Sequence, residues 1–166
     1  MSDAGRPTTL WREEVRPEDI AAIPALVAET GVFSPAEIDI AGELVAERLR
    51  DGPDCGYHFV LAERDGVLAA CACFGPIPGT EGSFDLYWIS ARPSFHRSGL
   101  AREALRRAEQ AAVALGARRM FIDTSSTPPY EPARALYRAL GYEQVALLPD
   151  FYRPGDGKAI FAKSLV

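Results

Sequence analysis

The sequence predicts an α/β fold with a mixed central sheet of about seven strands and about four helices. Two observations predict it. The chain has 166 residues, of which 48% are hydrophobic and 25% charged, as is typical of a soluble globular domain. Strand-like and amphipathic helical segments follow one another in the order strand, two helices, three strands, helix, strand, helix, two strands. This order needs antiparallel pairs as well as crossover helices. We therefore expect one domain over residues 1–166, with residues 1–7 as a flexible tail.

The first predicted strand covers about Thr8–Val15, and a helix follows over about Pro17–Glu29. Proline suits the first turn of a helix, and Gly31 lies just past the predicted end. Pro24 lies inside this helix, where it removes a hydrogen bond and crowds the preceding turn. We therefore expect Pro24 to kink or split the helix.

The next segments are a helix and a hairpin. Ser34-Pro35-Ala36-Glu37 is a capping box with proline at the first helical position, and the helix ends at Asp51-Gly52-Pro53. Tyr57–Glu63 and Val67–Phe74 are predicted to form the two strands of a hairpin, and Arg64-Asp65-Gly66 supplies the turn between them.

The second half of the chain is predicted to hold four more strands and two helices. A loop over Gly75–Gly82 leads into the strand Ser83–Ala91. An amphipathic helix opens after Gly99 and ends at Gly116. The remaining segments are the buried strand Arg119–Thr124, the helix Glu131–Leu140, the strand Tyr142–Leu148, the loop Pro149–Gly157 and the strand Lys158–Leu165.

Composition excludes several classes of protein. No apolar run approaches the ~20 residues of a membrane helix, and Met1–Thr9 lacks the apolar core of a secretory signal, so we expect a cytoplasmic protein that does not bind a membrane. The net charge of −5 argues against nucleic-acid binding and favours a cationic substrate. The three cysteines, Cys55, Cys71 and Cys73, predict neither a disulfide framework nor a metal site. We expect Cys71 and Cys73 to be buried as small hydrophobic residues.

The segment His96-Arg97-Ser98-Gly99-Leu100-Ala101 lies between a strand and an amphipathic helix. The first backbone N–H groups of a helix have no acceptor within the helix and lie at its positive end, which suits a phosphate or pyrophosphate. Gly99 lets a ligand approach the backbone, and Ala101 keeps the first turn slim. The spacing matches neither the dinucleotide fingerprint nor the Walker loop.

The segment is closest to Q/R-x-x-G-x-G/A, the acyl-CoA signature of the GNAT acetyltransferase superfamily, with His96 where that family usually has Gln or Arg. Ala133–Tyr142 is similar to a later motif of the family, A-x-x-L/F-Y-x-x-x-G-F/Y. Tyr130 stands where the family often has Asn. The order of elements also resembles the GNAT fold, from about Thr8 to Leu165.

The resemblance implies transfer of an acetyl group from acetyl-CoA to a primary amine, without a metal. It places the pyrophosphate on the backbone of Arg97–Arg102, with Arg97 and Arg102 as added phosphate contacts, and the pantetheine arm beside Ile89 and Ala91. Tyr137 would donate a proton to the departing thiolate. The cofactor-binding residues that we predict are Ile89, Ala91, His96, Arg97, Ser98, Gly99, Leu100, Ala101, Arg102 and Tyr130.

The residues leave the base and the acceptor open. Asp85 and Glu81 lie on or just before the strand that would carry the thioester, and either is a candidate to accept the amine proton; a solvated or loop-capping carboxylate is the alternative for each. Two roles remain open for the aromatic residues Tyr87, Trp88, Phe151 and Tyr152: they form the wall of an acceptor pocket, or they pack in the core. The acceptor is a small-molecule or peptide amine. A homodimer remains open, and a catalytically silent acyl-CoA-binding module is the alternative function.

Overall fold

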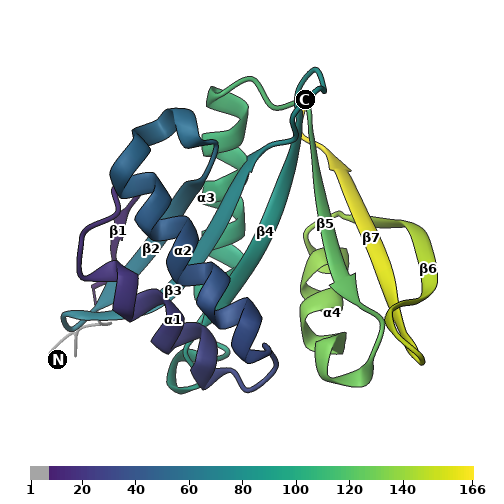
Figure 1. Ribbon diagram of the computed structural model, residues 1–166, viewed down its shortest axis with the longest axis horizontal. Helices are drawn as coiled ribbons and strands as arrows, with labels where there is room; N and C mark the ends of the chain where they lie inside the picture. The colour runs from purple at the N-terminus through teal and green to yellow at the C-terminus, as the bar shows by residue number, and fades with distance from the viewer. Residues whose placement is uncertain (1–7) are drawn as a thin grey trace, which may run out of the picture. The chain divides into compact units, whose positions relative to one another are not determined.

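The predicted seven strands and four α-helices are present in the computed structural model, which describes residues 8–166 (Figure 1). The strand order in the sheet is β1-β2-β3-β4-β5-β7-β6. Contacts divide the chain into two compact units, of which the first runs up to Cys73 and adds Ile89–Leu105, and the second holds Phe74–Trp88 and Arg106–Val166. The predicted tail, residues 1–7, lies outside the described residues.

The sheet of the first unit begins with β1 (Leu10–Arg12), which pairs antiparallel with β2 (His58–Arg64). The turn that the sequence predicts then leads to β3 (Val67–Pro76), with φ of 51° at Asp65 and 74° at Gly66.

The prediction of a first strand over Thr8–Val15 is too long. Past Arg12 the chain leaves the sheet, because the Arg12 guanidinium donates to both carboxylate oxygens of Asp19 at 2.7 Å and also to the Glu14 carbonyl. The backbone N–H of Arg16 donates to Asp19 as well, at 2.7 Å. Asp19 is buried, so these bonds satisfy a carboxylate that water cannot reach.

The two helices of this region are α1 (Asp19–Glu29) and α2 (Pro35–Asp51). The capping box at Ser34 is formed as predicted, with Glu37 N donating to Ser34 Oγ at 3.3 Å and Ser34 N to the Glu37 carboxylate at 2.7 Å. Of the two effects expected of Pro24, a kink or a split, the split does not occur, because α1 is continuous through Pro24. Gly42 of α2 leaves room for the proline: a Cβ at Gly42 would lie 3.1 Å from Pro24 Cγ.

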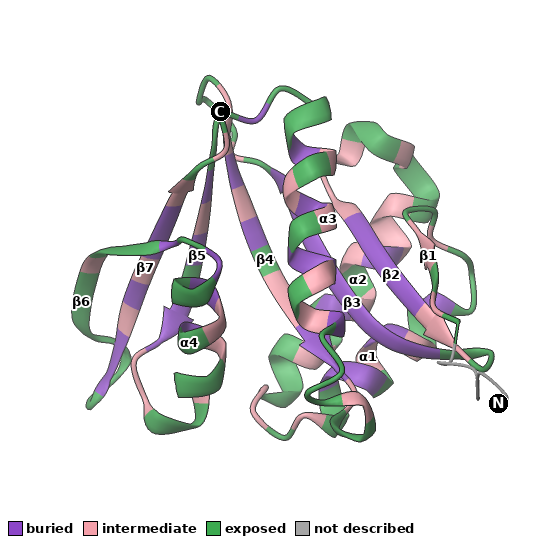
Figure 2. Ribbon diagram, turned by 180° about the vertical axis from the view of Figure 1, so that it is seen from behind, coloured by how far each residue is buried: buried purple, intermediate pink, exposed green. Residues whose placement is uncertain are grey.

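Figures 1 and 2 show α1 and α2 on one face of β2 and β3 and the first turns of α3 (Leu100–Ala114) on the other. Apolar side chains from these elements form the core, and Cys71 and Cys73 are fully buried within it. Burial raises the pKa of both thiols, so they behave as the small hydrophobic residues that the sequence predicts. No helix in residues 8–166 has the length and apolar character needed to cross a membrane.

In the second unit, β4 (Ser83–Ala91) pairs parallel with β5 (Arg119–Ser125), and the register runs from Ser83↔Arg119 to Leu86↔Ile122. β5 pairs antiparallel with β7 (Asp156–Ser164) along its whole length. The helix α4 (Glu131–Ala139) follows β5. The prediction that the segment Arg119–Thr124 is buried holds for one face only, because exposed Arg119 and Asp123 alternate with buried residues.

The last strand pair is longer than predicted. β6 spans Glu143–Arg153, so most of the predicted loop Pro149–Gly157 is strand, and the turn is reduced to two residues. The turn-like residues of this segment form an irregularity inside the hairpin instead: the register shifts between Leu148 and Arg153, and Asp150 has φ of 54°. The Asp150 carboxylate accepts from Gly155 N at 2.7 Å, which closes the hairpin end.

A substitution at Gly82 tests how much the contacts at the start of β4 contribute to stability. Its carbonyl accepts from the backbone N–H groups of Arg118 and Arg119, its φ is 77°, and a Cβ there would lie 3.0 Å from the Gly116 carbonyl oxygen. We expect Gly82→Ala to lower the free energy of unfolding by roughly 2–3 kcal/mol, from backbone strain and overpacking. Chemical denaturation measures this change.

Gly79→Ala is the matched control, because Gly79 lies in the same loop with φ of 75° but a Cβ there meets nothing within 4 Å. Only the strain of about 1 kcal/mol remains at Gly79. Equal losses in the two variants would show that the contacts around Gly82 contribute nothing.

Candidate active site

The predicted anion-binding turn lies in the first unit, between the end of β4 and the start of α3. A short 3-10 turn over Pro93–Phe95 is followed by left-handed conformations at Arg97 (φ 62°) and Gly99 (φ 80°). Glu103 N donates to the Gly99 carbonyl at 3.0 Å, which marks the first helical hydrogen bond. The N–H groups of the first helical turn therefore have no acceptor within the helix. Left-handed residues at such a position turn successive N–H groups toward one side and favour an anion.

Side chains of the turn stabilise the turn itself. His96 Nε2 lies 3.1 Å from the Ala91 carbonyl oxygen, and Ser98 Oγ donates to the Phe95 carbonyl. Leu100 is buried and packs in one apolar cluster with Ala91. The charged residues of the segment, Arg97 and Arg102, are exposed. The turn thus presents backbone and two guanidinium groups to the outside, while its other side chains anchor it.

Tyr137 lies in the second unit, on α4, and is 5% exposed. Its ring meets the edge of Phe161 with centroids 5.8 Å apart and is tilted against Tyr142 at 6.2 Å. Burial, and then the nearby Tyr130, raise the pKa of the Tyr137 phenol well above its ordinary value. The phenol is therefore protonated at neutral pH and available only as a proton donor. Tyr130 itself is the residue before α4.

The two candidate bases differ in their surroundings. Asp85 is half-buried on β4, and burial, followed by repulsion from Asp123, raises the pKa of its carboxyl group, against a smaller opposing effect of Lys158. Lys158 Nζ forms an ion pair with Asp123 at 2.7 Å. The side chain of Glu81 is exposed, and its backbone carbonyl accepts from the guanidinium of Arg118. Asp85 is the carboxylate whose environment suits a base.

Asp123 and Lys158 were not predicted from the sequence. The register places Asp85 opposite Phe121 on β5, and Lys158 of β7 opposite Ser125, so the side chains of Asp85, Asp123 and Lys158 share one face of the sheet. The alternation of polar and apolar residues along the two strands was the available signal. Which polar residues become neighbours depends on the register, which the sequence does not give.

Two of the four aromatic residues predicted to wall a pocket lie next to this group. Phe151 and Tyr152 of β6 are about half exposed and contact each other edge to face, with centroids 5.1 Å apart. Lys158 Nζ lies 4.7 Å from the centre of the Phe151 ring. We call Asp85, Asp123, Phe151 and Lys158 the Asp85 cluster.

The predicted site residues are thus divided between the two units. The turn and the end of β4, with Ile89, Ala91 and residues 96–102, belong to the first unit. The candidate catalytic groups Glu81, Asp85 and Tyr137, together with Tyr130, belong to the second. Within the second unit, Tyr137 lies near Tyr130, and Asp85 lies near charged groups that sequence reasoning missed.

Comparison with known proteins identifies the family. A model of the acetyltransferase (GNAT) family matches residues 23–142, more than half of the chain. An amino-acid acetyltransferase from Azotobacter vinelandii is 30% identical over 109 residues, which are 65% of this chain and 25% of that relative. The chain therefore spans about a quarter of the length of the curated relatives it matches.

Solved structures agree with the predicted fold. A crystal structure from Desulfovibrio desulfuricans, of a protein assigned to the GNAT family, is 41% identical with a TM-score of 0.93, and the match covers 96% of this chain and 100% of that chain. A structure from Salmonella typhimurium with its cofactor acetyl-CoA is 19% identical with a TM-score of 0.74, covering 95% and 94% of the two chains. At that identity the likeness concerns the fold. The predicted family and fold are confirmed.

The environment of Asp85 predicts how its removal changes stability with pH. Because its folded-state pKa lies above the ordinary value of 3.8, the ionised group destabilises the folded protein once the pH rises through the folded-state pKa. We expect Asp85→Asn to raise the melting temperature at about pH 7, with a gain that shrinks as the pH falls toward 3.8. Thermal unfolding over this pH range measures it.

Glu81→Gln, which removes an exposed negative charge from the preceding loop, is the control for charge removal itself. A lower melting temperature of Asp85→Asn at neutral pH would contradict the expectation, because it would show that the ionised carboxylate stabilises the fold.

Proposed function

This chain belongs to the acetyltransferase (GNAT) family, and from this premise we propose that it transfers an acetyl group from acetyl-CoA to a primary amine by direct attack on the thioester. The observation that carries the proposal is the turn before α3, where a strand end, left-handed residues at Arg97 and Gly99 and a helix start occur together. The same arrangement without the family match would indicate no more than an anion site.

The residues of the turn fit a pyrophosphate. A Cβ at Gly99 would meet nothing within 4 Å, so the backbone there is open to a ligand. The backbone N–H groups of Arg97–Arg102 would hold the phosphates, and the exposed guanidinium groups of Arg97 and Arg102 would add charge-assisted hydrogen bonds. The backbone of Ile89 and Ala91 would form hydrogen bonds with the pantetheine arm, as a sheet edge does with an added strand. When bound, acetyl-CoA supplies the activated acetyl group.

Two side chains of the second unit would move the protons. An alkyl amine with a pKa of ~10.4 must lose a proton before it attacks. Asp85 would accept this proton, directly or through a water molecule, and its raised pKa makes it a stronger base near neutral pH. The new bond joins the amine nitrogen to the acetyl carbon while the carbon–sulfur bond breaks. Tyr137 would donate its proton to the departing thiolate, which forms a neutral thiol.

The charge distribution supports a cationic acceptor. The chain carries a net charge of −5, and the Asp85 cluster holds two carboxylates for one lysine. Its partly exposed Phe151 ring offers an apolar contact beside the charges. The acceptor would accordingly be a small-molecule or peptide amine, and the curated relatives make an amino acid one candidate among them.

The experiment that tests the proposal is a screen of amines with acetyl-CoA, in which release of CoA thiol and the mass of the acetylated product are both recorded. Thiol release that depends on an amine, with a product heavier by one acetyl group, is the expected result. Binding of CoA without turnover of any amine would favour the silent acyl-CoA-binding module. A protein that does not respond to millimolar CoA in thermal or calorimetric titration would contradict both.

Gly99 tests the cofactor turn. Valine at this position is strained at φ of 80° and places its methyl groups in the open space before the backbone. We expect Gly99→Val to weaken CoA binding by about tenfold or more, so that the stabilisation by a fixed CoA concentration falls by about 1.4 kcal/mol or more. Isothermal titration of the folded variant measures it. Wild-type affinity would exclude this turn as the phosphate site.

Tyr137 tests the proton donor. Tyr137→Phe keeps the ring that packs on Phe161 and removes only the hydroxyl group. We expect kcat to fall by ~10² while CoA affinity stays nearly unchanged, because the lost interaction acts on the departing thiolate. Steady-state kinetics with chemistry shown to be rate-limiting measure it.

Tyr142→Phe is the matched control in the same aromatic group. Its hydroxyl donates to Glu109 at 2.9 Å, so its loss should lower stability and leave kcat within about twofold of the wild type. Near-wild-type kcat in Tyr137→Phe would leave Tyr137 as a packing residue.

A further inference from the structure

We infer that Arg134 is a positioning residue: its buried guanidinium group fixes the rotation of α4 about its axis and so directs the Tyr137 hydroxyl. The inference rests on the proposed function, in which Tyr137 is the proton donor. Arg134 itself would touch none of the reacting atoms.

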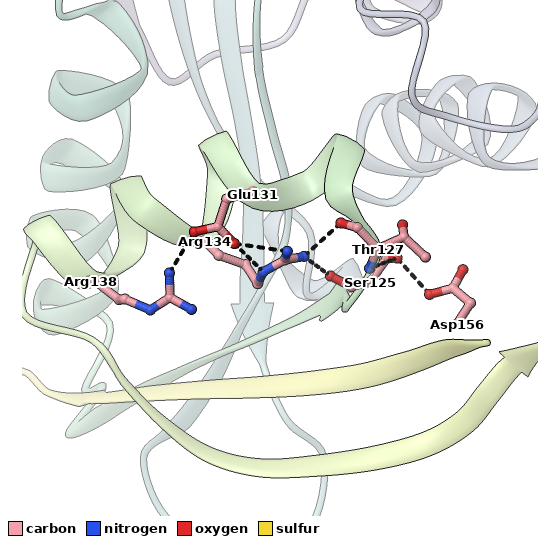
Figure 3. A network of polar contacts seen from close by, with 6 residues as sticks. All are labelled: Ser125, Thr127, Glu131, Arg134, Arg138 and Asp156. Carbon is pink, nitrogen blue, oxygen red and sulfur yellow. Dashed lines mark hydrogen bonds and ion pairs between the residues drawn. The ribbon is translucent and has the colours of Figure 1, made fainter.

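The contacts of Arg134 join three parts of the second unit (Figure 3). The side chain is buried, with 7% of the residue exposed. Its Nη1 donates to the backbone carbonyl groups of Ser125, the last residue of β5, and Thr127, the latter at 3.0 Å. Its Nε and Nη2 donate to the Glu131 carboxylate at 3.1 and 2.9 Å. One guanidinium thus ties the end of a strand and the following turn to the first residue of α4.

The segment after β5 that supplies these carbonyl groups is itself held in place. Ser125 Oγ donates to the buried carboxylate of Asp156, at the start of β7, at 2.5 Å, and it accepts from Thr127 N at 3.1 Å. The carbonyl groups that Arg134 binds therefore belong to a segment anchored to the next strand of the sheet, as Figure 3 shows. They provide a fixed reference for the helix.

The helix α4 depends on such tertiary contacts for its orientation. α4 has nine residues, and helices this short are marginal without tertiary contacts. Tyr130 precedes it and makes no side-chain hydrogen bond that caps the helix. A cation near a helix N-terminus is disfavoured by the helix dipole, and a buried one is destabilising unless it is paired. Arg134 is held there by the Glu131 carboxylate and two carbonyl groups, which defines one orientation of the first turn.

The orientation of Arg134 also determines the orientation of Tyr137, because of their spacing along the helix. Arg134 and Tyr137 are the buried residues of α4 and lie three apart, so they share one face of the helix. A rotation that moves Arg134 away from the strand end also turns the phenol. Proton transfer requires the donor within hydrogen-bond reach, and misplacement by about 1 Å can lower a rate ~10²-fold.

Replacing Arg134 with lysine separates the effect of its positive charge from the effect of its hydrogen-bonding geometry. Arg134→Lys keeps the positive charge but cannot reproduce the planar fork that reaches a carboxylate and two carbonyl groups together. Arg138→Lys is the matched control: Arg138 lies on the same helix and binds the same Glu131 carboxylate at 3.0 Å, but its side chain is 48% exposed and binds no carbonyl group of the strand end.

The experiment is a double-mutant cycle with Tyr137→Phe, in which kcat, KM and CoA affinity are measured for Arg134→Lys, Tyr137→Phe and the double variant, below the melting temperature of each. We expect Arg134→Lys alone to lower kcat about tenfold or more at nearly unchanged CoA affinity, and Arg138→Lys to stay within about twofold. In the Tyr137→Phe background, Arg134→Lys should change kcat by no more than about twofold, because no hydroxyl is left to direct.

Each outcome supports or overturns the inference. A similar loss of kcat in both backgrounds would mean that Arg134 acts through general structure and would overturn it. Wild-type kcat in Arg134→Lys would also overturn it. If Tyr137→Phe alone has wild-type kcat, the proposed proton donor fails first, and the inference fails with it.

Glu131→Gln repeats the cycle if Arg134→Lys does not fold. It weakens the same tie from its exposed partner while both carbonyl contacts remain. We expect a smaller loss of kcat than for Arg134→Lys, again absent in the Tyr137→Phe background; a loss of equal size in both backgrounds overturns the inference.

Discussion

The antiparallel register between β5 and β7 is the constraint on which the chemistry proposed for the second unit depends. β7 presents Phe161 to the Tyr137 ring on one face of the sheet and Lys158 to Asp123 on the other. Because successive side chains of a strand point to opposite faces, a slip by one residue would exchange the two sets. Seven paired positions between the strands oppose such a slip.

The register also gives the two proposed proton-transfer groups different surroundings. Tyr137 lies among aromatic rings, where burial keeps the phenol protonated, whereas Asp85 lies among charges at a partly exposed surface. In both cases burial disfavours the charged form and raises the pKa. The same physical effect therefore keeps the Tyr137 phenol in its protonated form and makes the Asp85 carboxylate a stronger base near neutral pH.

Features that depend on neighbouring residues were predictable from the sequence, and features that depend on distant ones were not. The capping box at Ser34 and the helix after Gly99 follow from local chemistry. α1 is continuous through Pro24, which lies against Gly42 of another helix, a contact between residues that are distant in the sequence. The site divides in the same way. Tyr137 was proposed as a site residue from a family motif. The partners of Asp85 are set by strand register, and the contacts of Arg134 by the path of the chain after β5.

The burial of Cys71 and Cys73 has a practical consequence for studying this protein in solution. A thiolate is the reactive form of cysteine, and both buried thiols have a raised pKa and no exposed surface. Cys55, in the short 3-10 turn that follows α2, is partly exposed. A thiol-directed fluorophore or spin label would attach to the folded chain at Cys55 alone. Cys55 thus provides an attachment point for a spectroscopic reporter beside the helical layer of the first unit.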